Sequence, residues 1–114
     1  MQSFGKIGED EAAQFLIKNN YQILDRNYRY KRAEIDIICR KGDLLVFVEV
    51  KSRSSAAYGL PETFVSKNQQ KSIIGAAEQY IHEMEWSAEV RFDIISIIRN
   101  KDEQELEHFK DAFY

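Results

Sequence analysis

The feature that most constrains the fold is a β-hairpin, which the sequence predicts between Glu34 and Lys51. Two segments rich in β-branched and apolar residues are joined there at Gly42-Asp43. A two-residue turn with glycine first fits the type II′ geometry, in which the first turn residue needs a positive φ. This turn fixes the register of the two strands, with Lys41 opposite Leu44.

The predicted register places four charged side chains on one face of the hairpin. Asp36 lies opposite Glu49, Glu34 lies opposite Lys51, and all four project to the same side because side chains alternate along a strand. The other face is wholly apolar, and we expect it to be core; it carries Ile35, Ile37, Cys39, Leu44, Val46, Val48 and Val50. The charges therefore gather at one end of a sheet that is covered on both sides.

The opposed acids favour a metal site. Two carboxylates that face each other on a half-buried sheet repel and destabilise the pair, whereas a bound divalent cation reverses the sign of that interaction. Mg²⁺ prefers one or two protein carboxylates with water and phosphate oxygens, which fits Asp36 and Glu49. Lys51 would then lie beside a metal-bound water. The alternative is a structural ion-pair cluster in which Glu34 pairs with Lys51.

Two predicted helices bring further polar side chains towards this end of the sheet. The first runs from about Gly8 to Asn19, and Glu9 lies in its apolar stripe. The second begins near Ser66, which forms a capping-box signature with Gln69. Gln70 lies one turn before the apolar stripe of this second helix. We expect Glu9 and Gln70 to complete the site, while the alternative for each is a polar residue that only reaches solvent.

Basic and aromatic residues alternate from Arg26 to Arg32. Arg26, Arg29, Lys31 and Arg32, together with Arg53 after the hairpin, are candidates for binding nucleic-acid phosphates. The alternative is an exposed edge strand that is protected by charge. The net charge of −3 argues weakly against a nucleic-acid partner, but residues 1–71 have a balance of +3 and residues 72–114 one of −6. The basic half is thus the half that holds the candidate site.

Length and composition exclude several classes of protein. The 114 residues suffice for one domain, residues 1–114, with one core. Cys39 is the single cysteine, so an intramolecular disulfide is excluded, and with two histidines the chain has no zinc-type spacing. The absence of disulfides is typical of proteins from a reducing compartment. The N-terminal segment turns acidic before any apolar region develops, and the longest apolar run, 44–48, cannot cross a bilayer. We therefore expect a soluble cytoplasmic protein with no membrane contact.

The periodicity of the chain predicts the element order α-β-β-β-α-β. Residues 21–30 form a strand before the hairpin strands 34–40 and 44–51, and residues 52–66, with the single proline, have no clear period. A strand at 90–98 follows the second helix, then a turn at 99–105 and a short final strand at 107–114. A strand, a helical crossover and another strand imply a right-handed parallel connection in a mixed sheet.

These residues, in this order, resemble the YraN-like family of small bacterial proteins. That family is similar in turn to the PD-(D/E)XK nucleases, especially the archaeal Holliday junction resolvases. Ala33 and Ile35 stand where those motifs usually have Gly and Pro, and neither difference removes a ligand. The motifs that carry the resemblance are Gly5, Gly8-Glu9, Glu34-Ile35-Asp36-Ile37-Ile38, Phe47-Val48-Glu49-Val50-Lys51-Ser52-Arg53, Tyr58-Gly59-Leu60-Pro61 and Arg91-Phe92-Asp93.

The resemblance implies a restriction-endonuclease-like α/β fold, a single domain with an αβββαβ core and a mixed sheet flanked by helices. By position, Asp36 is the first acid of the motif, Glu49 and Lys51 are its ExK pair, Glu9 is the helix carboxylate and Gln70 is the polar residue of the second helix. Mg²⁺ or Mn²⁺, held by Asp36, Glu49 and Glu9, is the implied cofactor. The implied reaction is hydrolysis of DNA phosphodiester bonds, with branched or flapped DNA as candidate substrates and a homodimer as in junction resolvases.

Two other classes of function remain open. One is a non-catalytic nucleic-acid-binding or adaptor module that uses the same scaffold with its basic segment and the 52–66 loop. The other is a protein-binding role for the acidic C-terminal part. Similarity of fold does not confer activity, so the site itself has to decide between them.

Overall fold

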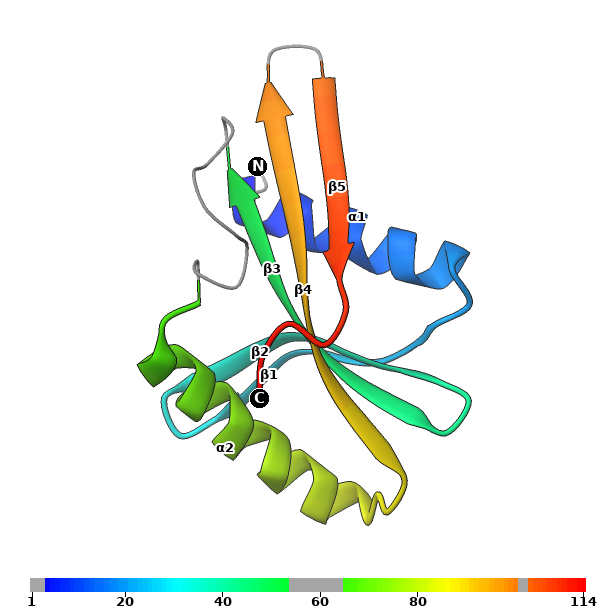
Figure 1. Ribbon diagram of the computed structural model, residues 1–114, viewed down its shortest axis with the longest axis vertical. Helices are drawn as coiled ribbons and strands as arrows, with labels where there is room; N and C mark the ends of the chain where they lie inside the picture. Colours follow the sequence, from blue (N-terminus) through cyan, green and yellow to red (C-terminus); the bar gives the residue numbers. More distant parts are fainter. Residues whose placement is uncertain (1–3, 54–64, 101–102) are drawn as a thin grey trace.

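The computed structural model describes residues 4–53, 65–100 and 103–114. Two helices and five strands follow one another in the order α1, β1, β2, β3, α2, β4, β5 (Figure 1). Their bounds are α1 Phe4–Lys18, β1 Gln22–Tyr30, β2 Ala33–Lys41, β3 Leu44–Arg53, α2 Lys67–Met84, β4 Glu89–Asn100 and β5 Glu103–Phe109.

The strands form one sheet in the order β1-β2-β3-β4-β5. β3 and β4 are parallel and are connected through α2, while β1–β2, β2–β3 and β4–β5 are antiparallel. The predictions of a single α/β domain and of a mixed sheet with one parallel crossover are therefore confirmed. The antiparallel strand β5 is an additional strand that follows the αβββαβ core.

The hairpin between β2 and β3 has the predicted register. Gly42 has a φ of 61°, and Lys41 pairs with Leu44. Only the first turn residue has a positive φ, as a type II′ turn requires. The ladder continues as far as Ile37 opposite Val48 and ends there.

Both faces of the sheet are covered, by one helix each. On one face α2 packs over Ile38, Phe47 and Phe92; on the other α1 packs over Ile37, Val46 and Val48. Neighbouring residues of a strand thus belong to opposite cores, as strand alternation requires. Ile35 is an exception, because it packs with the α2 cluster and not beside Ile37 as expected. It lies beyond the last β2–β3 pair, where the strands have left the regular ladder.

The structure corrects two predicted boundaries. α1 begins at Phe4, one turn before the expected start, and β5 spans Glu103–Phe109 where a turn and then a later strand were expected. The sequence gives little signal for β5, because the strand is largely exposed and has few apolar residues. After it the chain turns back, the Ala112 N–H donates to the Phe92 carbonyl at 2.7 Å, and Phe113 is buried. The expected features within 54–64, including Pro61, lie outside the described residues.

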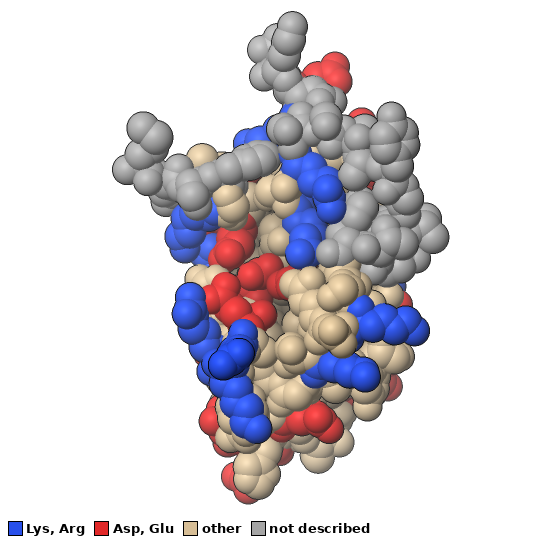
Figure 2. Space-filling model, turned by 90° about the vertical axis from the view of Figure 1, so that its left-hand side faces the viewer, with Lys and Arg blue, Asp and Glu red and all other residues tan. Residues whose placement is uncertain are grey.

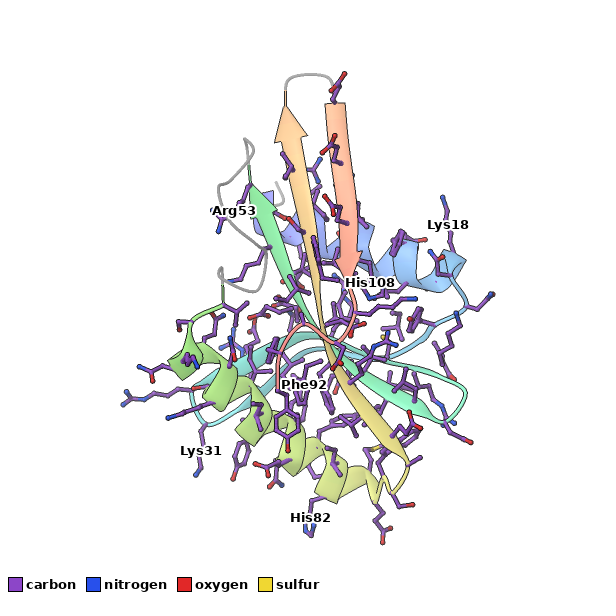
Figure 3. All side chains as sticks on the ribbon, in the orientation of Figure 1. Lys18, Lys31, Arg53, His82, Phe92 and His108 are labelled. Atoms are coloured by element: carbon purple, nitrogen blue, oxygen red, sulfur yellow. The ribbon has the colours of Figure 1, made fainter. Side chains whose placement is uncertain are left out.

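A buried charge network joins the last two strands. The fully buried Asp93 accepts from the Arg91 guanidinium at 2.8 Å, lies 2.7 Å from His108 Nε2, and accepts from the Asp111 N–H at 3.0 Å. Arg91 also donates to the Tyr21 hydroxyl. His108 reaches this network from β5, near the middle of the molecule (Figure 3). The network therefore fixes β5 and the following segment to β4.

Burial alone would raise the pKa of the Asp93 carboxyl. Hydrogen bonds from His108, Arg91 and the backbone of Asp111 outweigh that effect, so the pKa lies below its usual value. A carboxylate held in this way has a structural role.

Neither of the two helices in the described ranges is long and apolar enough to span a membrane.

Replacing Asp93 by asparagine should lower the free energy of unfolding at neutral pH by about 3 kcal/mol, because it leaves the Arg91 charge without its buried partner. Asp93 stabilises the protein above the ordinary carboxyl pKa of 3.8, and this contribution is lost as the pH falls through the lower folded-state pKa. In urea unfolding, the difference between wild type and Asp93→Asn should shrink below about pH 4. Glu107→Gln, exposed on β5, is the control, and a difference that does not change with pH would contradict this role.

Candidate metal and phosphate site

A polar pocket opens where β2 and β3 separate, beside the first turns of α2. Its volume is about 440 Å³. The described residues that line it include three acids and two bases, namely Glu34, Asp36, Glu49, Arg32 and Lys51. The side of the molecule on which α2 begins shows acidic side chains gathered in one patch, with Lys and Arg on both sides of it (Figure 2). We call this cavity the acidic pocket.

Asp36 and Glu49 are in contact at its base. One Asp36 oxygen accepts the Val50 N–H at 2.8 Å, and the Asp36 and Glu49 carboxyl groups lie close enough to interact. Glu49 is 6% exposed. Its burial, followed by its hydrogen bond and charge contact with Asp36, raises the pKa of Glu49 to about 9, while the Lys51 ammonium acts in the opposite direction. Two acids that would both be ionised in water, one buried and one half-buried, are thus held against each other.

The second helix contributes Gln69 to this site. The Gln69 amide donates to a Glu49 oxygen at 2.8 Å and fixes the orientation of that carboxyl. Gln70, which was expected in this place, donates instead to the Val65 carbonyl at 3.0 Å and does not line the acidic pocket. The reason is the helix start: the Ser66 hydroxyl accepts the Gln69 N–H at 3.1 Å, which confirms the predicted cap and turns Gln69 towards the sheet.

The first helix brings a further carboxylate to the same end of the sheet. Glu9, Glu34 and Asp36 each place an oxygen within 4.8 Å of the others. The Asn27 amide donates to Glu9 at 2.9 Å and holds it there. Asp36 therefore belongs to two acidic contacts, one with Glu49 and one with Glu9 and Glu34. The predicted hairpin register places Glu34 in this cluster, but the sequence motifs assign it no role as a ligand.

A glycine sets the distance between α1 and β3. A Cβ added at Gly8 would lie 2.0 Å from the Ser52 Oγ and 3.3 Å from the Ser52 Cβ. Since Gly8 directly precedes Glu9, this close approach decides how far the Glu9 carboxylate reaches towards Asp36.

Two of the predicted phosphate-binding residues pair with acids of the site. Arg26 lies 2.8 Å from Asp10 and 3.7 Å from Glu9, and the Arg29 guanidinium lies 2.9 Å from Glu34. The expected partner of Glu34 was Lys51, so Arg29 takes that place. Because Arg29 is 78% exposed, solvent screens its pair strongly.

Two of the remaining predicted basic residues, Arg32 and Lys51, line the acidic pocket directly. Lys31 occupies the turn between β1 and β2, with its ammonium 5.4 Å from the centre of the Tyr30 ring. Arg53 is the last residue of β3 (Figure 3). Arg32 and Lys51 thus place positive charge beside the acids, which helps a polyanion to approach them.

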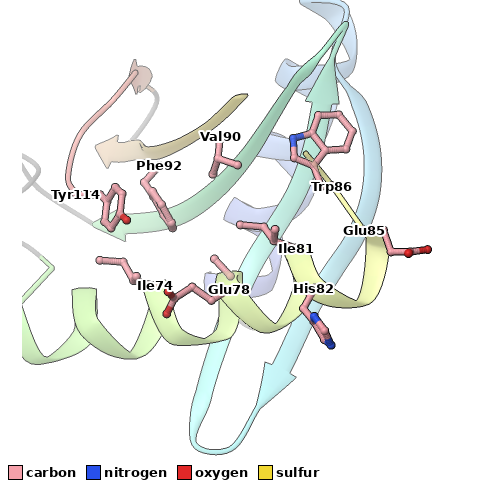
Figure 4. Close-up of a pocket in the computed structure, with 10 residues that line it drawn as sticks. Ile74, Glu78, Ile81, His82, Glu85, Trp86, Val90, Phe92 and Tyr114 are labelled. Carbon is pink, nitrogen blue, oxygen red and sulfur yellow. The ribbon is translucent and has the colours of Figure 1, made fainter. Parts of the chain in front are cut away.

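A larger pocket of about 760 Å³ lies between α2 and β4 (Figure 4). Its walls are mainly apolar and include Ile74, Ile81, Trp86, Val90, Phe92 and Tyr114. The acids that line it, Glu78 and Glu85, are both exposed. The larger cavity therefore has no acid of its described lining that is buried as Glu49 is, and the acidic pocket is the better candidate for chemistry.

The donors of the acidic pocket fit a divalent cation that prefers oxygen. Glu34, Asp36 and Glu49 line it, and Glu9 has an oxygen within 4.8 Å of Glu34 and Asp36, so Asp36 can bind such an ion together with Glu49, Glu9 or Glu34. The contact between Asp36 and Glu49 is unfavourable for two anions and becomes favourable with a cation between them. No histidine or cysteine of the described residues lines this pocket, so the site suits Mg²⁺ or Mn²⁺ better than zinc.

Comparison with known proteins gives a family match over most of the chain. The family described as "Uncharacterised protein family UPF0102" matches residues 8–97. A UPF0102 protein of Christiangramia forsetii is 46% identical over 110 residues, which cover 96% of this chain and 92% of the relative. A UPF0102 protein of Flavobacterium johnsoniae is also 46% identical, and one of Clostridium beijerinckii is 45% identical, over 96% of this chain and 93% and 91% of those relatives.

Gly8→Ala should destabilise the protein by about 1–2 kcal/mol, although alanine is the better helix former, because its Cβ meets Ser52. Gly75→Ala on α2 is the matched control. Its Cβ meets nothing within 4 Å, so the same change should stabilise by up to about 1 kcal/mol. Urea unfolding of both variants measures these effects, and equal shifts of the same sign would show that the α1–β3 contact is not tight.

Proposed function

The chain belongs to the uncharacterised protein family UPF0102, and we propose that it is a metal-dependent nuclease that hydrolyses phosphodiester bonds in the acidic pocket. The observation that carries this proposal is the contact between the buried carboxyl group of Glu49 and the half-buried one of Asp36, beside Lys51. A structural role alone gives no reason to keep these two acids together, whereas phosphodiester hydrolysis uses such a pair.

The proposed cofactor is Mg²⁺ or Mn²⁺. Asp36, Glu49 and Glu9 are the ligands that sequence analysis favours, and Glu34 is a fourth candidate because of its distance to Asp36 and Glu9. When bound, the ion polarises the phosphate and lowers the pKa of an attacking water.

The residues of the chain supply binding and orientation. The Val50 N–H and the Gln69 amide hold the Asp36 and Glu49 carboxyl groups in fixed orientations. The Lys51 ammonium orients the attacking water and stabilises the negative charge that develops on the phosphate. Arg32, at the rim of the pocket, binds a phosphate next to the one that is cleaved. DNA is the substrate that we favour, and the cytoplasm is the compartment.

A second candidate function is a nucleic-acid-binding module without turnover. The ion pairs of Arg26 with Glu9 and of Arg29 with Glu34 favour it, because they compensate two of the four acids without any metal. This candidate uses the same basic rim and makes Glu49 dispensable for binding.

Cleavage assays separate the two candidates. Duplex, single-stranded, flapped and four-way-junction DNA are each incubated with Mg²⁺, with Mn²⁺ or with EDTA. Cleavage should require metal, and Glu49→Gln and Lys51→Ala should each lower its rate by about 100-fold or more, whereas Glu105→Gln on the exposed part of β5 should leave it unchanged. Metal-dependent cleavage that survives both substitutions would place the chemistry at another site.

Metal binding can be measured without any substrate. A ligand of the native state stabilises it by about 2.7 kcal/mol at a hundred times its Kd, so saturating Mn²⁺ should raise the melting temperature of the wild type by several degrees. Asp36→Asn should abolish the rise, because Asp36 belongs to both acidic contacts, and Glu105→Gln should keep it. An equal rise in Asp36→Asn would exclude these carboxylates as the binding site.

A further inference from the structure

A second cavity adjoins the acidic pocket and shares part of its wall. Its volume is about 400 Å³, and it lies between the turn that joins β1 to β2 and the middle of α2. Arg32, Ala33 and Ser72 line both cavities, so a molecule bound in one reaches the other without crossing the protein. We call this cavity the side pocket. The described residues that line it are Tyr30, Lys31, Arg32, Ala33, Lys71, Ser72, Gly75 and Ala76.

The side pocket combines an aromatic ring with positive charge. Tyr30 is half-buried and packs on the α2-side core, which fixes the position of its ring. The exposed side chains of Lys31, Arg32 and Lys71 supply three cations, and no acid is among the described residues of the lining. The neighbouring acidic pocket has the opposite character. A ligand that spans both therefore needs a flat apolar group for the ring and negative charge for the cations.

The turn at the edge of this pocket has an unusual backbone. Tyr30 pairs with Ala33, and Lys31 has a φ of 56°, a region that residues other than glycine, asparagine and aspartate enter rarely. Such a conformation costs about 1 kcal/mol or more, and residues held in it are concentrated at functional sites. In this turn the Lys31 ammonium lies over the Tyr30 ring, 5.4 Å from its centre.

We propose that the side pocket binds the base of an unpaired nucleotide, next to the phosphate that is bound in the acidic pocket. The base stacks on Tyr30 in the place of the Lys31 ammonium, and Lys31 and Lys71 then bind the phosphates on either side. In a continuous duplex both faces of each base are covered by its neighbours, so no base can enter. The substrate class is therefore single-stranded or flapped nucleic acid. This inference rests on the proposed function for the role of the acidic pocket.

Binding in EDTA tests the side pocket without any cleavage. Fluorescence anisotropy compares a short oligothymidylate, a duplex of the same length and an abasic oligonucleotide with the same backbone. Tyr30→Ala should weaken binding of the oligothymidylate by about 5- to 150-fold, the range that one aromatic–base stack supplies. Tyr30→Phe should bind as the wild type does, and Tyr30→Ala should leave the affinity for the abasic strand unchanged.

Gly75 offers an independent variant that leaves Tyr30 in place. A Cβ at Gly75 meets nothing within 4 Å, so Gly75→Ala should keep the affinity for oligothymidylate, whereas the long side chain of Gly75→Met should fill the pocket and lower it. Glycine-to-methionine changes in a helix do not weaken the helix, and thermal melting checks that each variant is folded.

The two proposals can fail separately. If Tyr30→Ala and Gly75→Met both bind oligothymidylate as tightly as the wild type, the side pocket holds no base, whatever the cleavage assays show. The same conclusion follows if Tyr30→Ala weakens the abasic strand equally. If both variants lose affinity only for strands with bases, and no DNA is cleaved with Mg²⁺ or Mn²⁺, the base pocket stands and the nuclease proposal is wrong.

Discussion

The register of the β2–β3 hairpin is the constraint on which the rest of the structure depends. Gly42 sets it at one end, and at the other end the ladder stops where the Asp36 carboxylate accepts the Val50 N–H. Because side chains alternate, this register sends the large apolar residues of both strands into the two cores and brings Asp36 against Glu49 at the open end. A slip of one residue would exchange the faces of a whole strand and would separate these acids. The contact of these two carboxyl groups is unfavourable when both are ionised, and it persists because the apolar residues on both faces fix the strands that carry it.

The sequence predicted the fold well wherever one pattern determines the structure. The hairpin register, the Ser66 cap and the parallel crossover follow from local turn and helix signals. Strand β5 was placed too late because its exposed polar residues give no apolar period. In the site, helical spacing alone favoured Gln70 over Gln69. Which of these two neighbours faces the site depends on the geometry of the helix cap, which only the three-dimensional structure shows. The pairing of Glu34 with Arg29 instead of Lys51 likewise depends on how β1 lies beside β2.

The acidic side chains of the site differ in their basic partners according to where they lie. The resemblance to the YraN-like family is confirmed by the match to UPF0102, and the acids that it assigns to one site lie together at one end of the sheet. Among the described residues, Arg26 and Arg29 form ion pairs with the outer acids Glu9 and Glu34, while Lys51 is the cation that acts on the inner acid Glu49. Glu49 is buried and Asp36 is half-buried, so water screens the charges of this inner pair less than those of the exposed Arg29 pair.

The parallel pairing of β3 with β4 has a consequence for the order in which the site is assembled. Asp36 and Glu49 belong to a hairpin that closes over a two-residue turn, which is a fast and local event. Leu44 pairs with Glu89 and Arg53 with Ile98, so the β3–β4 ladder closes a loop that contains all of α2, and such long-range closure is slow. Gln69 reaches Glu49 only when α2 settles on the sheet. The two acids are therefore brought together by a local step, and the Gln69 hydrogen bond that orients Glu49 is added by a long-range step.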